Sequence, residues 1–293
     1  MTYSYLFNIA DINIKLDSDK SLDITDHFLP FISHDSPDYK VCFHKASESE
    51  IQRQKRTYLH EEDCFSILDK EDGDIEVREF YPDLDHREKV YAIGSYDLKH
   101  HKVSIRYLEA GRSHLNQSDN CFYHIALEKM LLQERRMILH SCCVVSDYGG
   151  ICFSGDSGIG KSTQGDLWMR YKHADIINGD RTILYKREGR WLGAGSPYAG
   201  SSRVYKNEKV AMRAIVMLQQ SRENKIRRLK SGEAFLRIYR QITVNGWDRD
   251  FVNQVITMIE ELIADLPVYE LSCTPDERAV NLLDSTFKED MDI

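Results

Sequence analysis

In the stretch CFSGDSGIGKSTQG, residues 152–165, the glycines at 155, 158 and 160 and a lysine lie between an apolar run and a segment with helical character. Within it, residues 155–162 (GDSGIGKS) complete the pattern G-x-x-x-x-G-K-[ST] of a phosphate-binding loop. The pattern is meaningful only between a strand and a helix, and the flanking residues predict both: a strand over 149–154 and a helix over 162–173. This context favours a nucleotide phosphate site over a simple glycine-rich turn.

The residue types in this loop suit an anion. Glycines permit backbone angles that let successive N–H groups turn inward around a phosphate. Lys161 would place its charge against the β- and γ-phosphates, and the Ser162 hydroxyl would ligate Mg²⁺. The N-terminus of the following helix adds partial positive charge. The predicted nucleotide-binding residues are Gly155, Asp156, Ser157, Gly158, Ile159, Gly160, Lys161, Ser162 and Thr163.

A phosphate loop that serves phosphoryl transfer needs a carboxylate nearby, to hold the metal or to accept a proton. Asp180 follows the apolar residues 176–177 at the tip of a predicted strand. We therefore predict Asp180 as a metal ligand, together with Ser162, or as a catalytic base. The alternative is structural, because Asn-Gly-Asp at 178–180 is also ordinary turn chemistry. Asp175 suits a cap or a solvated loop better.

Outward from the loop, strands and helices alternate to the end of the chain. Residues 118–136 predict one amphipathic helix, and 137–163 predict a strand, a turn, a second strand and the loop. We therefore expect an α/β catalytic domain over 118–293. Residues 1–117 predict a mostly β, antiparallel region that would serve substrate recognition. There, residues 7–16 alternate apolar and polar side chains and predict a strand.

Composition narrows the function classes. The chain has 293 residues and a net charge of −8, which excludes nucleic-acid binding through bulk positive charge. Its seven cysteines include no CxxC pair, so zinc and iron–sulfur sites have no support. No apolar run approaches the ~20 residues of a membrane span. We expect a cytoplasmic protein with neither nucleic-acid nor membrane partners.

Several of these motifs together resemble a known family. The segments 139–163 and 178–181 are similar to the catalytic domain of HPr kinase/phosphorylase, within the wider phosphoenolpyruvate-carboxykinase-like kinases. GDSGIGKS is close to that family's own form of the loop. GAGSPYAGSS, residues 193–202, resembles a loop of the related lasso-peptide kinases, with Tyr198 in the place of a tryptophan. The resemblance covers about residues 118 to 285 and implies an α/β P-loop kinase fold.

The resemblance implies transfer of a phosphoryl group from ATP or GTP, with Mg²⁺, to a hydroxyl that is commonly a serine. By the same resemblance Lys161 holds the phosphates, Asp180 ligates metal or accepts the proton, and His140 orients or tunes that acid. Taken alone, a histidine on a strand between two apolar or small residues fits a structural role equally well. Members of the group often form homo-oligomers.

The chain also departs from the family pattern. HPr kinase shows two adjacent acids at the strand tip, whereas Gly179 stands here in place of the first. The N-terminal region differs as well, which disfavours HPr as the substrate. The pattern is nearer to stand-alone kinases of modified-peptide pathways. Three functions stay open: a kinase of a peptide or protein hydroxyl, a kinase of a free small molecule, and a nucleotide-binding sensor with little turnover.

Basic residues after the 193–202 loop are further candidates. Arg203, Lys206 or Arg213 could act on the transferring phosphoryl group as an arginine clamp does. For each taken singly, we favour a solvated basic face. Tyr198 is expected to pack within the active-site loop.

Overall fold

The computed structural model describes residues 2–51, 58–62, 64–68, 75–198 and 200–290. The chain divides into two compact units, residues 1–133 and residues 134–293. The predicted boundary after residue 117 is therefore placed too early. The reason is packing, because the segment after residue 117 contributes Phe122 to the core of the first unit. The ring centroid of Phe122 lies 5.3 Å from that of Phe7 and 4.7 Å from that of Phe28.

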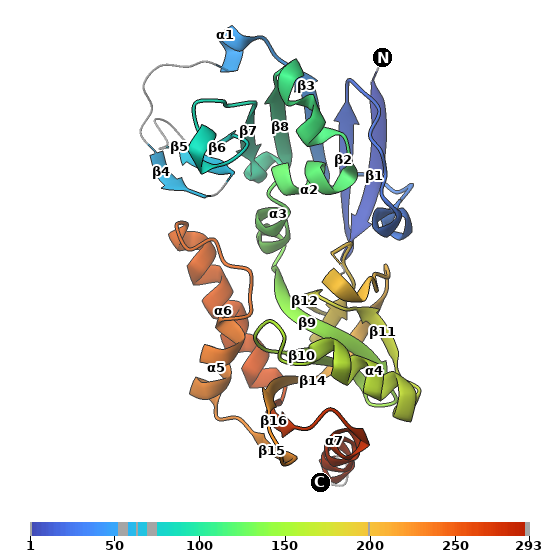
Figure 1. The fold of residues 1–293 in the computed structure, drawn as a ribbon. Helices are drawn as coiled ribbons and strands as arrows, with labels where there is room; N and C mark the ends of the chain where they lie inside the picture. Colours follow the sequence, from blue (N-terminus) through green and yellow to red (C-terminus); the bar gives the residue numbers. More distant parts are fainter. Residues whose placement is uncertain (1, 52–57, 63, 69–74, 199, 291–293) are drawn as a thin grey trace. The chain divides into compact units, whose positions relative to one another are not determined.

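Unit 1 is built around one sheet (Figure 1). Its described strands are β1 (Tyr3–Ile9), β2 (Ile12–Ser18), β3 (Tyr39–Lys45), β4 (Tyr58–Glu61), β5 (Phe65–Leu68), β6 (Glu76–Phe80), β7 (Ala92–Asp97) and β8 (Lys102–Tyr107). Its described helices are η1 (Asp26–Phe31), α1 (Glu48–Ile51), η2 (Leu84–His86), η3 (Leu98–His100), η4 (Glu109–Leu115), α2 (Ser118–His124) and α3 (Leu127–Gln133).

The strands of unit 1 lie in the order β1-β2-β3-β8-β7-β6-β5-β4. The expected antiparallel pairing holds for the other described neighbours in this sheet but is wrong for β3, which runs parallel to both β2 and β8. Parallel neighbours require connections that return the chain to the same edge of the sheet. The segments between β2 and β3, and between β3 and β8, make these returns.

Two local predictions in unit 1 are wrong for the same physical reason. Residues 7–16 form a hairpin instead of one strand, because Ala10 and Asp11 adopt φ values of 49° and 64°. Positive φ at both central residues is typical of a tight turn that matches strand twist. The helix expected over 118–136 is interrupted at Ala126, where φ is 56°. A left-handed residue ends a helix, so α2 and α3 are separate.

Unit 2 mixes strands and helices. Its described strands are β9 (Arg136–Ser146), β10 (Gly149–Ser154), β11 (Asp175–Asn178), β12 (Arg181–Arg187), β13 (Arg190–Ala194), β14 (Lys209–Gln220), β15 (Lys225–Arg228) and β16 (Val268–Cys273). Its described helices are α4 (Lys161–Lys172), η5 (Gly200–Ser202), α5 (Ser231–Tyr239), α6 (Arg249–Asp265) and α7 (Glu277–Glu289). The mixed α/β character predicted for this part of the chain is confirmed.

Two long strands organise the sheet of unit 2. The first half of β9 pairs with β12 and its second half with β10. In the same way β14 pairs first with β13 and then with β10 and β16. Together with the β12–β13 hairpin, these pairings close a ring of strands. Because β10, β14 and β16 are parallel, their carboxyl ends meet at one edge. The glycine-rich loop begins at that edge.

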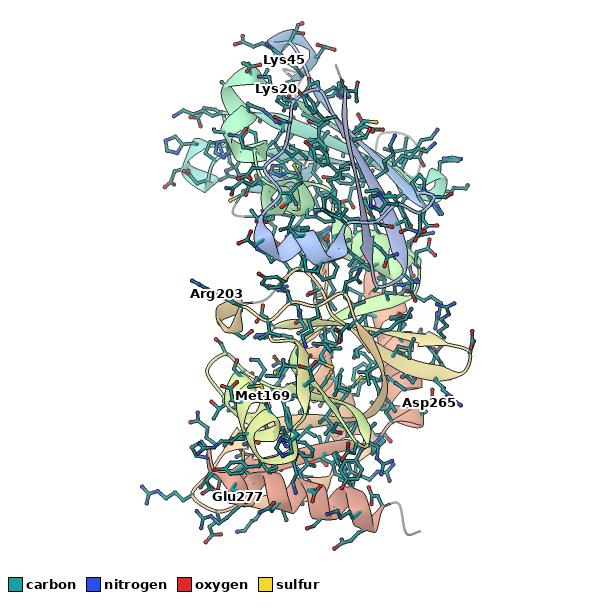
Figure 2. All side chains as sticks on the ribbon, turned by 90° about the vertical axis from the view of Figure 1, so that its right-hand side faces the viewer. Lys20, Lys45, Met169, Arg203, Asp265 and Glu277 are labelled. Carbon is teal, nitrogen blue, oxygen red and sulfur yellow. The ribbon has the colours of Figure 1, made fainter. Side chains whose placement is uncertain are left out.

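The helices of unit 2 complete its core. Helices α4 and α7 bury Trp168 and Phe287 against Phe153 of β10, with ring centroids 6.2 Å apart in each of the pairs Phe153–Trp168 and Trp168–Phe287. The outer side of α4 carries the exposed Met169 (Figure 2). Helices α5 and α6 lie together, away from α4 and α7 (Figure 1). Within the described part of the chain, no helix combines the length and apolar character needed to cross a membrane.

Candidate nucleotide and phosphoryl-transfer site

The glycine-rich loop has the strand and the helix that its sequence requires. Strand β10 ends at Ser154 and α4 begins at Lys161. In between, the backbone φ angles of Gly155, Gly158 and Gly160 are 142°, 75° and 112°. These angles lie in the region that favours glycine. The loop therefore has the backbone conformation from which inward-turned N–H groups can surround an anion.

Lys161 lies inside this loop. Its side chain is 8% exposed, and Nζ donates to the carbonyl oxygens of Gly155 at 3.0 Å and of Asp156 at 3.2 Å. Burial lowers the pKa of Lys161, while the carboxylates of Asp180 and Asp156 oppose that shift. On the far side, Gln220 Nε2 donates to the carbonyl of Gly158 at 3.1 Å. Hydrogen bonds from Lys161 and from Gln220 of β14 therefore stabilise the loop.

Asp180 and His140 form a pair beside the loop. His140 Nε2 lies 3.3 Å from Asp180 Oδ1, and Arg181 Nε lies 3.5 Å from Asp180 Oδ2. Burial and the charge of Lys161 lower the pKa of His140, although Asp180 raises it. The net direction favours a neutral imidazole near pH 7. A neutral ring can donate from Nε2 to the carboxylate and fix its direction.

Strand register brings these residues together from distant parts of the chain. His140 lies opposite Arg181 in the β9–β12 pair, and Ser141 lies opposite Ser154 in the β9–β10 pair. The Ser154 hydroxyl donates to the carbonyl of His140 at 2.8 Å, and Ser141 N donates to the carbonyl of Asp180 at 2.9 Å. The end of β10, the middle of β9 and the start of β12 therefore meet at one place. All three residues predicted to be catalytic lie there.

Asn178 supports the site and was missed as a functional residue by the sequence reasoning. Its side chain is fully buried. Oδ1 accepts from the backbone N–H of Asp180 at 2.9 Å and of Arg181 at 2.6 Å. Nδ2 donates to the carbonyls of Ser196 and Tyr198, each at 3.0 Å. The turn at 178–180 is therefore a local side-chain turn that positions Asp180, so the turn and site interpretations are compatible. The only local signal was the Asn-Gly-Asp turn itself.

Gly200 of the GAGSPYAGSS loop, residues 193–202, lies directly against this acid. A Cβ atom added to Gly200 would lie 2.9 Å from the Cβ of Asp180, and Gly200 has φ of 54°. The Arg181 guanidinium carbon lies 5.9 Å from the ring centroid of Tyr198. Residue 199 of this loop lies outside the described residues. The expected packing of Tyr198 beside the site agrees with this contact.

The other basic candidates have roles away from Asp180. Arg203 is exposed and points outward (Figure 2). Lys206 forms an ion pair with Asp175, which gives that carboxylate a structural role. Arg213 is half-buried, and its guanidinium carbon lies 5.6 Å from the ring centroid of Phe287. The expectation of a solvated basic face fits Arg203 and is wrong for Arg213.

Comparison with known proteins gives little overall similarity. No protein-family model matches the chain, and no curated protein matches it. Among solved structures, the HPr(Ser) kinase/phosphatase from Coxiella burnetii is similar over 53% of this chain and 90% of that chain, with 13% identity and a TM-score of 0.32. A similarity of this degree does not by itself establish membership of a family.

Proposed function

We propose that unit 2 binds a nucleoside triphosphate, ATP or GTP, and transfers its terminal phosphoryl group to a hydroxyl, most simply a serine of a peptide or protein. One observation carries the proposal: a glycine-rich loop with positive φ at Gly155, Gly158 and Gly160 meets the His140–Asp180 pair at the same sheet edge. The loop suits the phosphates of the nucleotide, and the His140–Asp180 pair suits the hydroxyl that would accept the phosphoryl group. The similarity of the 139–163 and 178–181 motifs to those of HPr kinase agrees with this division of roles.

On the donor side, the loop N–H groups and the start of α4 would face the phosphates. Lys161 Nζ now contacts two loop carbonyls, and a phosphate oxygen would replace them with a stronger, charged acceptor. Developing charge on the phosphoryl oxygens would then lie against Lys161. Charge neutralisation of this kind supplies much of the catalysis in phosphoryl transfer.

The donor atoms near the loop fit Mg²⁺. That ion is usually held by one or two carboxylates together with substrate phosphates and water. Ser162 and Asp180 offer a hydroxyl and a carboxylate, and no cluster of three or more metal-ligating side chains is found among the described residues. Ser162 and Asp180 would thus hold an ion that arrives with the nucleotide. When bound, Mg²⁺ would offset the negative charge of the phosphates.

On the acceptor side, Asp180 would take the proton of the attacking hydroxyl. His140 and Arg181 hold one carboxylate oxygen each, which fixes the plane of the group. The acceptor oxygen forms its bond to the γ-phosphorus as the bond to the bridging oxygen breaks. The nucleoside diphosphate leaves with that electron pair, and the proton stays on Asp180. His140 touches neither phosphorus nor acceptor in this scheme and orients the base.

A sensor with little turnover is the second candidate. The observation that favours it is Gly179, which leaves Asp180 as the one carboxylate at the strand tip where HPr kinase has two adjacent acids. A single acid would have to serve both the metal and the proton. Nucleotide binding would then persist with slow transfer.

The experiment is a transfer assay with γ-³²P-ATP and Mg²⁺ against pooled peptides and, separately, a metabolite extract. We expect label in an acceptor with the wild type, with loss of at least ~100-fold in Asp180→Asn, the scale of a lost catalytic base. Lys161→Ala should lose nucleotide binding as well. Competition by unlabelled GTP tells which nucleotide is preferred.

The matched control is Asp175→Asn, which changes an exposed carboxylate on the neighbouring strand β11. This variant should transfer label as the wild type does. Label in a peptide identifies the proposed acceptor class, and label in a metabolite identifies a small-molecule kinase. Tight nucleotide binding that needs Lys161, with no transfer to either pool, would contradict the kinase and support the sensor.

A further inference from the structure

A cavity of about 320 Å³ adjoins the glycine-rich loop on the side of β14. The residues of its wall that bear polar groups include Gly155 and Asp156 of the loop and Arg237, Arg240 and Gln241 at the end of α5. The remaining wall is formed by Ile159 of the loop and by Met217, Leu218 and Gln219 near the carboxyl end of β14. Its volume lies near the lower limit of small-molecule sites, enough for one side chain or a small metabolite.

Two loop residues that border the cavity, Gly155 and Asp156, are the ones that contact Lys161. The lysine of such a loop reaches the β- and γ-phosphates. Here Lys161 Nζ lies 3.0 Å from the carbonyl oxygen of Gly155 and 3.2 Å from that of Asp156. Those two residues are also part of the cavity wall. A group in the cavity would therefore lie beside the phosphoryl group that is transferred.

One residue joins the cavity to the acid–base pair. The carbonyl oxygen of Gln241 accepts from the backbone N–H of His140 at 2.8 Å. The side-chain Nε2 of the same residue donates to Asp156 Oδ1 at 3.1 Å. Gln241 thus borders the cavity while it holds the strand that carries His140. The cavity and the His140–Asp180 pair are neighbours at the same sheet edge.

The charges around the cavity are unevenly balanced. Arg237 forms an ion pair with Glu270, which also accepts from Arg227 Nε at 2.8 Å. Arg240 is exposed, and no carboxylate lies within ion-pair distance of its guanidinium in the part of the chain that the structure describes. The carboxylate of Asp156 also borders the cavity, and its Oδ1 accepts from the side-chain amide of Gln241. One guanidinium at the cavity is therefore available to an incoming anion.

We propose that this cavity seats an anionic group of the phosphoryl acceptor, with Arg240 as the residue that binds it. The proposal rests on the function proposed above and narrows it. The acceptor would be a hydroxyl compound with a carboxylate or phosphate close to the reacting hydroxyl. A planar guanidinium offers paired donors that match both groups. An acidic residue next to a serine, or a free hydroxy acid, carries this chemistry.

The test is calorimetric titration of the full chain with matched anionic and neutral probes. Glycerate is compared with glycerol, and acetyl-Gly-Ser-Asp-amide with acetyl-Gly-Ser-Asn-amide. Each pair is titrated with and without a non-hydrolysable ATP analogue and Mg²⁺. We expect at least one anionic probe to bind fivefold or more tightly than its neutral partner. Arg240→Gln should remove that preference. Arg222→Gln, which loses an exposed arginine between β14 and β15, should keep it.

Each outcome has one meaning. A preference in the glycerate pair or in the peptide pair identifies the source of the anion. No preference in either pair overturns the proposal. The proposal also fails if Arg240→Gln weakens binding of the ATP analogue as much as binding of the probe, because Arg240 would then hold the nucleotide. Failure of the analogue to bind would contradict the kinase function, and the titrations without nucleotide would still report the anion preference.

Discussion

Three neighbours restrict the carboxylate of Asp180: His140, Arg181 and the backbone of Gly200. We predict that Gly200→Ala lowers the transfer rate at least ~10-fold while nucleotide affinity stays within about twofold, since a displaced catalytic group loses its geometry. The added methyl would displace Asp180, whose Cβ, Cγ and Oδ1 are the atoms nearest to it. The control is Gly189→Ala, which has a similar positive φ of 78° but open space around its Cβ. Equal loss in both variants would contradict the role of the Gly200 contact.

His124 makes the stability of unit 1 depend on pH. It is fully enclosed, Nε2 lies 2.9 Å from the Tyr91 hydroxyl, and burial lowers the pKa of His124 from 6.5 to about 4. Between these values the unfolded chain binds a proton that the folded unit does not, so stability falls as pH decreases from 6.5 toward 4. This difference in pKa between the unfolded and folded states corresponds to about 3 kcal/mol in the free energy of unfolding.

Urea unfolding at pH 7, 5 and 4 measures this effect. In His124→Gln the free energy of unfolding should fall less between pH 7 and pH 4 than in the wild type, because residue 124 can no longer bind a proton on unfolding. This comparison holds whatever the stability of the variant at pH 7. His34→Gln, which alters an exposed histidine, should keep the wild-type slope. An unchanged slope in His124→Gln would show that other groups cause the acid sensitivity.

At the residue scale, the spacing of glycines, lysine and serine over 155–162 predicted the glycine-rich loop. Phosphoryl transfer at such a loop requires a nearby carboxylate, so an acidic residue was expected. Asp180 was found in this way because it follows a strand. The pairing of His140 with Asp180 came from the family resemblance, since the two are brought together by strand register. The bridging role of Asn178 depends on carbonyls of Ser196 and Tyr198, and Arg240 borders the cavity only because the fold brings the end of α5 beside the glycine-rich loop. No local pattern encodes such contacts.

At the scale of elements, α4 packs so closely on β9 that Gly165 is required within it. A Cβ atom there would lie 2.7 Å from Cys142 Sγ and 3.3 Å from Ile176 Cδ1. Alanine would improve helix propensity by about 1 kcal/mol, yet overpacking costs about 1–3 kcal/mol. We predict that Gly165→Ala lowers the free energy of unfolding. Gly232→Ala in α5, where nothing lies within 4 Å, should raise it.

Denaturant midpoints of the two variants check this prediction. The glycine-to-alanine change should lower the denaturant midpoint in α4 and raise it in α5. Stabilisation by Gly165→Ala would show that Cys142 moves aside at little cost. Helix propensity alone describes Gly165 as unfavourable in α4, because propensity depends on the helix and not on the strand beside it.

Element types followed from periodicity more reliably than element ends. The strand–loop–helix around residues 149–172 is as predicted, because glycine and the apolar run mark its limits. The turn at Ala10–Asp11 and the break at Ala126 were missed because alanine has no preference for positive φ. Tertiary packing imposes these conformations. Parallel pairing of β3 was missed for a related reason, since pairing partners lie far away in the sequence.

At the scale of the molecule, the site and the cavity lie within unit 2. We predict that an ATP analogue with Mg²⁺ slows hydrogen exchange in residues 153–163, 178–182 and 195–198, with little change in β1–β8. A ligand at 100 times its Kd stabilises the state that binds it by about 2.7 kcal/mol. Uniform protection of both units would contradict a site confined to unit 2. The cytoplasmic location, the homo-oligomer and the absence of nucleic-acid or membrane partners stay predictions.

The position of Lys161 has a consequence for how the loop meets its ligand. The ammonium group already donates to the carbonyls of Gly155 and Asp156, which take the place that phosphate oxygens would have. The conformational entropy of ordering the loop is therefore lost during folding and not during binding. Nucleotide entry becomes an exchange of partners around a fixed cation. Affinity should then depend on competition with those two carbonyls, and even a short polyphosphate without a nucleoside should bind measurably.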